Sequence, residues 1–186
     1  MIINTNRWNI IRYTLYVPIY DLTQRIFTSA RKKSIEALKI KDGDNVLIVG
    51  AGTGLDLKYI QARCNITAID ITPAMVRQIN KRKHKGSVNL RAMVMDGHSL
   101  SFPDESFDKI ILHFILAVIP DPVACIKEVE RVLKPDGCAI VLDKFIGKNT
   151  DVSVIRKSIN LITNFLFSDI TRCFEVIASS DRKSVV

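Results

Sequence analysis

The stretch Val46-Leu47-Ile48-Val49-Gly50-Ala51-Gly52-Thr53-Gly54 joins an apolar run directly to three glycines. A run of aliphatic and β-branched residues predicts a buried strand, and the glycines let the backbone turn sharply and approach a ligand closely. A second apolar run ends on Asp70, twenty residues after Gly50. Strand, glycine turn, helix, strand and acid make up the layout of a nucleoside-binding half of an α/β domain. This layout places the Asp70 carboxylate where it can accept hydrogen bonds from both hydroxyls of a ribose.

The spacing of the glycines indicates which nucleoside is bound. A dinucleotide-binding turn of the form G-x-G-x-x-G would need a glycine at position 55, where this chain has Leu55. In such turns a pyrophosphate lies against the helix N-terminus, and the third glycine permits close helix packing. S-adenosylmethionine (SAM) carries no phosphate. The observed G-x-G-x-G spacing therefore favours SAM over NAD or FAD.

From about residue 45 onward, apolar runs alternate with helical patterns. The expected strands are 46–49, 66–70, 90–95, 109–114 and 138–145, and the expected helices are 55–63, 73–83 and 122–133. Continuous apolar strands are typical of a parallel sheet buried on both faces, and right-handed crossovers place helices on both of them. Lys134-Pro135-Asp136-Gly137 predicts a helix stop and a turn before the last strand. The expected fold is a doubly wound, mostly parallel Rossmann-like α/β sheet.

The length of 186 residues predicts a single domain. Residues 1–40 are expected to form a helical lid or substrate segment, 41–145 the SAM-binding core, and 146–186 a helical C-terminal segment. No apolar run approaches the length of a bilayer span, and the first residues lack the regions of a signal peptide, so we expect a cytoplasmic protein. The four cysteines form no C-x-x-C pair, so no metal site is expected.

Five motifs follow one another in a fixed order along the chain. They are the strand and glycine turn at 46–54, then the segments 68–75, 96–97, 102–108 and 131–137. In this order they resemble the class I SAM-dependent methyltransferases, in the group that includes quinone-biosynthesis methyltransferases. A narrower resemblance, to bacterial phosphatidylethanolamine N-methyltransferases, is carried by Tyr13 with 18–22, by 118–122 and by 169–175. The resemblance implies SAM as cofactor and S-adenosylhomocysteine as product.

The resemblance also implies which residues bind the cofactor. The turn residues Gly50, Ala51, Gly52 and Gly54 would line its methionine part, and Asp70 would hold the ribose. Asp96 and the Gly97 backbone would bind the adenine amino group, Ile71 and Met75 would pack on the adenine faces, and Tyr13 is similar to a tyrosine that reaches the SAM carboxylate. A carboxylate after a strand can instead cap a helix or a turn, which leaves a structural alternative open for both acids.

Two residues are candidates for catalysis. His113 closes the fourth expected strand, where the family places substrate-facing residues, and its imidazole is suited to taking a proton or orienting a head group. Tyr20 would line the substrate side. A structural role in packing is the alternative for both. Methyl transfer from a sulfonium needs little acid catalysis, because the leaving thioether is neutral, and an amine acceptor must also lose a proton.

The sequence departs from the family pattern at two places. Many relatives carry an acid two residues before the first glycine, where it orients the methionine amino group, and this chain has Ile48 there. Asp56 is expected either to compensate for that acid or to face solvent. Relatives also end in an antiparallel hairpin that this sequence lacks or has only in part, and an uncovered sheet edge would favour a homodimer.

The N-terminal segment and the net charge suggest two partners. Residues 7–20 mix aromatic, basic and aliphatic side chains, which suits a helix at a lipid interface, and Lys and Arg near an anionic surface each add about 1 kcal/mol of attraction. A lid helix over the SAM pocket is the alternative, and the net charge of +8 is also consistent with a solvated basic surface. No nucleic-acid partner is expected, because the chain shows no appended RNA-binding domain.

The leading hypothesis is therefore a SAM-dependent methyltransferase acting on a lipid amine or another small acceptor. A quinone or natural-product C- or O-methyltransferase is one alternative. A SAM-binding module without catalysis is another, because of Ile48 and the missing hairpin.

Overall fold

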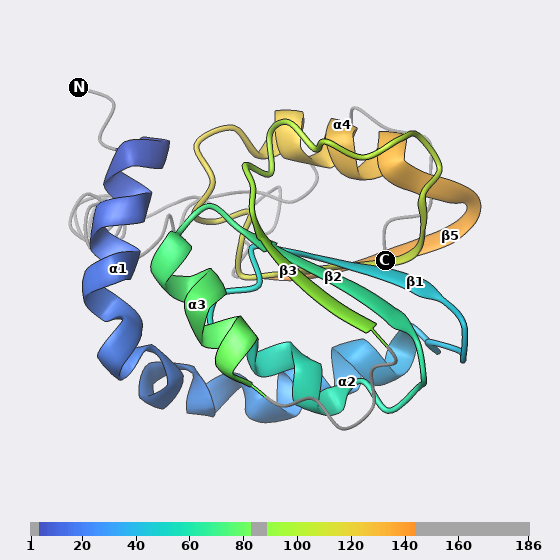
Figure 1. Ribbon diagram of the computed structural model, residues 1–186, viewed down its shortest axis with the longest axis horizontal. Helices are drawn as coiled ribbons and strands as arrows, with labels where there is room; N and C mark the ends of the chain where they lie inside the picture. The colour runs from blue at the N-terminus through green and yellow to red at the C-terminus, as the bar shows by residue number, and fades with distance from the viewer. Residues whose placement is uncertain (1–3, 83–88, 144–186) are drawn as a thin grey trace, which may run out of the picture.

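A computed structural model describes residues 4–82 and 89–143, and five parallel strands form its centre (Figure 1). The strands are β1 (Asn45–Val49), β2 (Asn65–Asp70), β3 (Asn89–Val94), β4 (Phe107–His113) and β5 (Leu133–Leu142). Their order in the sheet is β3-β2-β1-β4-β5, and every neighbouring pair is parallel. The chain winds outward from β1 in one direction and then in the other, so the predicted doubly wound sheet is confirmed.

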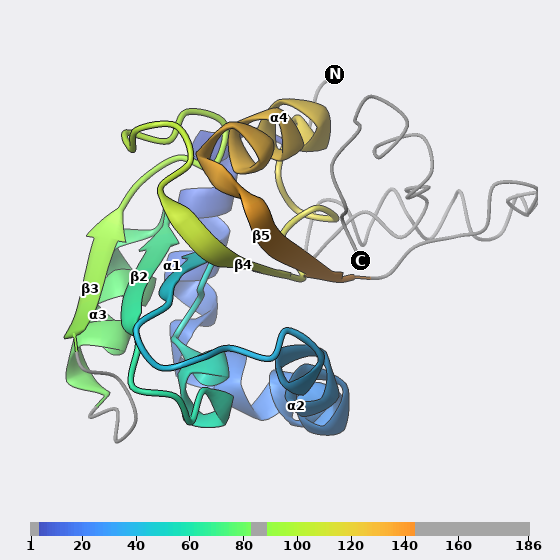
Figure 2. The same cartoon turned by 90° about the vertical axis from the view of Figure 1, so that its right-hand side faces the viewer.

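Helices cover both faces of this sheet (Figure 2). They are α1 (Asn6–Thr23), η1 (Gln24–Phe27), α2 (Thr28–Ala37), η2 (Leu55–Tyr59), α3 (Pro73–Lys81) and α4 (Pro122–Val132). Alternate residues of β1 point to opposite faces, so Leu47 packs with Ile126 of α4 and Ile48 packs with Ile35 of α2. Burial on both faces explains why β1 is apolar on both sides.

Helix α1 packs mainly against α3 and the pocket instead of covering a face of the sheet. It begins after Thr5, whose hydroxyl accepts the Trp8 N–H, and it lies alongside α3 near the carboxyl ends of the strands (Figure 1). Its inner side contributes Asn6, Asn9 and Tyr13 to a pocket at that edge. The predicted helical character of residues 1–40 is confirmed for the part that the structure describes.

The expected helix at 55–63 is wrong in type and length. The structure has only the short 3₁₀ turn η2, and the chain is already extended at Ile60. Leu57 and Ile60 are both buried. One of these side chains comes from the turn and the other from the extended chain after it, so tertiary packing overrides the helical propensity of this segment.

The last strand begins earlier than expected. Strand β5 starts at Leu133 directly after α4, and its register with β4 shifts between the pairs Phe107↔Leu133 and Lys109↔Cys138. The predicted turn at 134–137 is therefore absorbed as an irregularity inside β5. The end of that predicted strand, the C-terminal helical segment 146–186 and the C-terminal hairpin lie outside the described residues.

Candidate functional site

A pocket lies at the carboxyl ends of β1, β2 and β4, where the direction of winding reverses between β1 and β4. Ligands of open α/β sheets bind at such a switch point. The pocket contains about 640 Å³ of space, part of it open to solvent. The predicted site residues that line it are Tyr13, Tyr20, Gly50, Gly52, Asp70, Ile71, Met75, Asp96, Gly97 and His113. Ala51 and Gly54 do not line it.

Two glycines of the turn have positive φ angles and close neighbours, so neither position has room for a side chain. Gly50 has a φ of +66°, and a Cβ there would lie 2.7 Å from Ile115 Cδ1. Gly52 has a φ of +56°, and a Cβ there would lie 3.1 Å from the Tyr20 hydroxyl. The absence of side chains thus keeps the floor of the pocket open between Tyr20 and β1.

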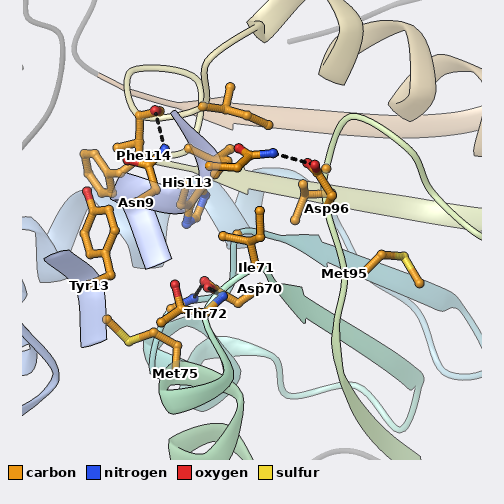
Figure 3. Close-up of a pocket in the computed structure, with 18 of the residues that line it drawn as sticks. Asn9, Tyr13, Asp70, Ile71, Thr72, Met75, Met95, Asp96, His113 and Phe114 are labelled. Carbon is orange, nitrogen blue, oxygen red and sulfur yellow. Dashed lines mark hydrogen bonds between the residues drawn. The ribbon is translucent and has the colours of Figure 1, made fainter. Parts of the chain in front are cut away.

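Asp70 is held at the end of β2 by two backbone amides. The Gly52 N–H donates to Oδ2 at 2.9 Å and the Thr72 N–H to Oδ1 at 2.8 Å. Burial raises the pKa of Asp70, and these two hydrogen bonds partly offset the rise. Each oxygen keeps a second lone pair, so the carboxylate can still accept from a pair of hydroxyls in the pocket. Figure 3 shows Asp70 with Ile71 and Thr72 facing the residues from α1.

Asp96 lies at the opposite end of the pocket, after β3. Its Oδ1 accepts the backbone N–H and the ring Nδ1–H of His98, at 3.0 Å and 2.7 Å. His98 Nε2 accepts the Asp121 N–H, which requires the proton to be on Nδ1. The second oxygen of Asp96, Oδ2, accepts from the Asn6 side-chain amide at 2.6 Å. Asp96 is thus oriented from both sides, and the contact with α1 was not visible in the sequence.

His113 belongs to a buried network that joins α2, η2 and β4. Its Nδ1 lies 3.0 Å from Asp56 Oδ1, and its Nε2 lies 2.9 Å from Ser34 Oγ. Asp56 also accepts from Arg31 Nη1 at 2.8 Å and 2.9 Å. Burial acts to raise the pKa of Asp56, but the contacts with His113 and Arg31 outweigh it. The pKa of Asp56 is therefore lowered, and this carboxyl is ionised. Because Asp56 only accepts, His113 Nδ1 carries a proton and the ring orientation is fixed.

Neither expectation for Asp56 holds. It is 2% exposed, so it does not face solvent, and it does not line the pocket, so it does not replace the acid absent at Ile48. Sequence reasoning missed Ser34 and Arg31 as its network partners, because nothing local links α2 to the turn after β1. The geometry favours an orienting role for His113, since both ring nitrogens already contact protein atoms. A catalytic role stays a prediction.

Tyr13 and Tyr20 form the wall that α1 contributes to the pocket. Burial raises the pKa of Tyr13 to about 12 and raises that of Tyr20 further, so both remain neutral phenols at neutral pH. Their rings meet edge to face, with centroids 6.3 Å apart. As neutral phenols they can donate hydrogen bonds or offer ring faces, but they are poor bases.

A second pocket lies on the other side of this wall and holds about 870 Å³ of empty space. It shares Tyr13, Tyr20, Phe114 and Val118 with the first pocket. Tyr16 and Phe27 add two further aromatic rings, and Asp143 is the only acid among the described residues that line it. Asp143 Oδ2 accepts the Ala117 N–H at 2.9 Å. The two pockets are therefore neighbours that share the wall formed by Tyr13 and Tyr20.

Known proteins show which chemistry accompanies this arrangement. A family model described as a methyltransferase domain matches residues 47–141. A phosphatidylethanolamine N-methyltransferase of Cereibacter sphaeroides is 28% identical over 171 residues, which cover 90% of this chain and 84% of that protein. A demethylmenaquinone methyltransferase of Tropheryma whipplei is 34% identical over 114 residues, which cover 61% of this chain and 47% of that protein.

A solved structure agrees with these relatives. The crystal structure of a SAM-dependent methyltransferase from Methanosarcina mazei is 27% identical, with a TM-score of 0.56 over 73% of this chain and 67% of that one. The chain thus spans most of one curated relative's length and about half of the other's. The range matched by the family model contains the glycine turn, Asp70 and Asp96.

Proposed function

The chain belongs to the methyltransferase-domain family and is a SAM-dependent methyltransferase, and from that premise we propose that its methyl acceptor is an amine on a lipid, of the phosphatidylethanolamine kind. The observation that carries this proposal is the second pocket, where aromatic rings and one carboxylate adjoin the cofactor pocket. A positively charged amine is attracted both by aromatic ring faces and by a carboxylate.

The residues of the first pocket fit SAM. Two carboxylates, Asp70 and Asp96, stand at separate places in a pocket whose other lining is largely apolar, as a nucleoside with two sets of donors requires. When bound, SAM supplies an electrophilic methyl group on a sulfonium. We assign Asp70 to the ribose, Asp96 with Gly97 to the adenine, and Ile71 and Met75 to the adenine faces. Tyr13, Gly50 and Gly52 are assigned to the methionine part.

The chain's task in the reaction is to hold the amine nitrogen, once its proton has passed to water, in line with the methyl group. Such positioning can supply about 7–11 kcal/mol of the barrier. We assign Tyr20 to the boundary where the two molecules meet and His113, fixed by Asp56 and Ser34, to the orientation of that boundary. Arg12 and Arg31 lie over the rings of Tyr13 and Phe114, at 5.0 Å and 4.8 Å, so two of the aromatic rings of the second pocket already contact a cation. We expect the ammonium near Asp143.

The outer side of α1 fits a lipid surface. Ile11, Leu15, Ile19 and Leu22 recur at helical spacing and are 45–71% exposed, and Ile26 in η1 continues the row at 80%. Ile19 and Ile26 also line the second pocket, so the row leads to its opening. An apolar helix face of this kind, on a chain of net charge +8, suits an anionic bilayer. No helix within the described ranges is long and apolar enough to span a bilayer.

A second candidate acceptor is a quinone, which the similarity to the demethylmenaquinone methyltransferase favours. Aromatic walls also stack on a quinone ring, but a carboxylate offers it no attraction. The role of Asp143 therefore separates the two candidates.

The test supplies methyl-labelled SAM with vesicles containing either phosphatidylethanolamine or a demethylated quinone. We expect label on the amine lipid, with transfer strongly reduced in Asp143→Asn while binding of S-adenosylhomocysteine is kept. Asp136→Asn, which changes an exposed acid in β5, is the matched control. Label on the quinone, or equal activity in Asp143→Asn and the control, would contradict the proposal.

A further inference from the structure

Asn9 is the most unusual polar residue of the cofactor pocket. It is 3% exposed, it lines the pocket from α1, and its Oδ1 is buried with no hydrogen-bond donor among the described residues (Figure 3). A buried acceptor without a donor is destabilising, because it has lost its contact with water and gained no partner. Native structures rarely retain such a group unless water or a ligand satisfies it.

The orientation of the Asn9 amide is determined by its neighbours. Its Nδ2 donates to Asn4 Oδ1 at 3.1 Å and to the Val118 carbonyl at 3.3 Å. Asn4 Nδ2 donates to the same carbonyl at 2.7 Å, which in turn fixes the Asn4 oxygen toward Asn9. Exchanging oxygen and nitrogen in Asn9 would bring acceptors face to face. The oxygen of Asn9 is therefore the atom left without a protein donor.

The two carboxylates of the pocket have defined donors already. Asp70 accepts from the amides of Gly52 and Thr72, and Asp96 accepts from His98 and Asn6. The position two residues before Gly50 is Ile48, which is buried and apolar. Among side-chain oxygens that line the described pocket, Asn9 Oδ1 is thus the buried acceptor that lacks a donor.

The cofactor has three groups that donate hydrogen bonds: the adenine amino group, the ribose hydroxyls and the α-ammonium of its methionine part. The carboxylates of Asp96 and Asp70 suit the first two. Asn9 lies one turn of α1 before Tyr13 and one turn after Asn6, which contacts Asp96. Residues four apart lie on one side of a helix, so Asn9 and Tyr13 present neighbouring groups to the pocket.

We propose that Asn9 Oδ1 accepts a hydrogen bond from the α-ammonium of SAM and so supplies the contact that Ile48 does not provide. An amide oxygen is a suitable partner for an ammonium, because hydrogen bonds to charged groups are stronger than those between neutral groups.

The test compares two ligands on the full chain by calorimetry. S-adenosylhomocysteine carries the ammonium, whereas 5′-methylthioadenosine keeps the adenosine and thioether and lacks the amino-acid part. In Asn9→Leu we expect binding of S-adenosylhomocysteine to weaken about tenfold or more, the scale of a lost hydrogen bond to a charged group. Binding of 5′-methylthioadenosine should change less than about twofold, since it does not present the ammonium.

A second variant separates the acceptor from the anchoring of α1. Asn9→Asp keeps an oxygen toward the ligand but loses the Nδ2 donors to Asn4 and Val118, and it should retain the preference for S-adenosylhomocysteine. Equal weakening of both ligands in Asn9→Leu would show that the residue only anchors the helix or contacts the ribose. Unchanged binding of both ligands with a raised KM for the acceptor would assign the donor to the acceptor instead. Either result overturns the proposal and leaves SAM dependence intact.

Discussion

Helices α4 and α1 cover the molecule in opposite ways. Helix α4 buries Cys125, Ile126, Val129 and Val132 against the sheet. Helix α1 buries Asn9 and Arg12 instead, and it leaves Leu15 71% exposed and Leu22 63% exposed. An ordinary surface helix has the arrangement of α4, with its apolar stripe facing the core. Helix α1 has polar groups toward the ligand pocket and an apolar row on the outside.

This difference indicates that α4 stabilises the core and that α1 forms part of the ligand site. The inner side of α4 stabilises the fold through the burial of apolar area, which needs no partner of defined geometry. The inner side of α1, and Arg31 in α2, bury polar groups that are tolerated only when specific partners satisfy them. The N-terminal segment is therefore organised around the site, and the changes below test this contrast.

The largest effect is expected from breaking the buried ion pair that ties α2 to η2. Asp56→Ala removes the partner of Arg31, whose guanidinium is 2.8 Å away, and of His113. We expect the free energy of unfolding to fall by about 3–5 kcal/mol, because an uncompensated charge stays buried. Glu36→Ala is the matched control on α2, since its pair with Lys32 is exposed and spans 3.7 Å. Urea denaturation measures both, and equal losses would contradict a special role for the buried pair.

The same pair gives a dependence on pH. The pKa of Asp56 is lowered from 3.8, so its contribution to stability is present above that value and is lost as the pH falls through the lower folded value. The difference in stability between the wild type and Asp56→Asn should therefore be constant near neutral pH and shrink below about pH 4. A difference that shrinks already between pH 7 and 5 would contradict this assignment.

A second prediction compares matched apolar truncations on the two helices. Ile126→Ala in α4 should lower the free energy of unfolding by about 2–5 kcal/mol, because the residue is buried and leaves a cavity. Leu15→Ala in α1 should stay within about 0.5 kcal/mol of the wild type, because the side chain is already exposed. In a flotation assay with anionic vesicles, the order should reverse, with Leu15→Ala losing binding and folded Ile126→Ala keeping it.

This contrast also explains which parts of the structure the sequence predicts. Local patterns predict four elements, namely the strands β1, β2 and β4 and the helix α3. Apolar runs, Pro73 and the glycine spacing identify these segments without any knowledge of their distant neighbours. The site residues that were missed, Ser34 and Arg31, depend on contacts between distant segments. Asn9 could have been found, because Asn9, Tyr13, Tyr16 and Tyr20 recur at spacings of three and four and so share one side of a helix.

A third prediction concerns Asp70, where the sheet itself provides a ligand contact. Asp70→Ala should weaken binding of S-adenosylhomocysteine by about ten- to a hundredfold, because two hydroxyls lose a charged acceptor. Binding in the wild type should also weaken as the pH falls through the raised pKa of Asp70, since the protonated carboxyl accepts less well. Asp104→Ala, which changes an exposed acid far from the pocket lining, should bind normally in the same calorimetric measurement. Equal binding by both variants would remove Asp70 from the site.

The smallest effect on the free energy of unfolding is expected at the C-terminal end of α1, where Asp21 contacts Thr53 and Arg82. Asp21 accepts from the Thr53 hydroxyl at 2.5 Å and forms an ion pair with Arg82, just after α3. Both charged side chains are partly exposed, so Asp21→Asn should change the free energy of unfolding by only about 0.2–1 kcal/mol.

The local effect of Asp21→Asn should exceed the global one, because α1 has few apolar contacts to replace this fastening. Hydrogen exchange should therefore rise in α1 while the amides of β1 and β4 keep their protection. Thr14→Ala is the control within α1, since its hydroxyl contacts only the helix's own Ile10 carbonyl among the bonds described. A uniform rise in exchange over α1 and the strands would mean that α1 unfolds together with the core. In that case the polar inner side of α1 would stabilise the fold as fully as the apolar side of α4 does.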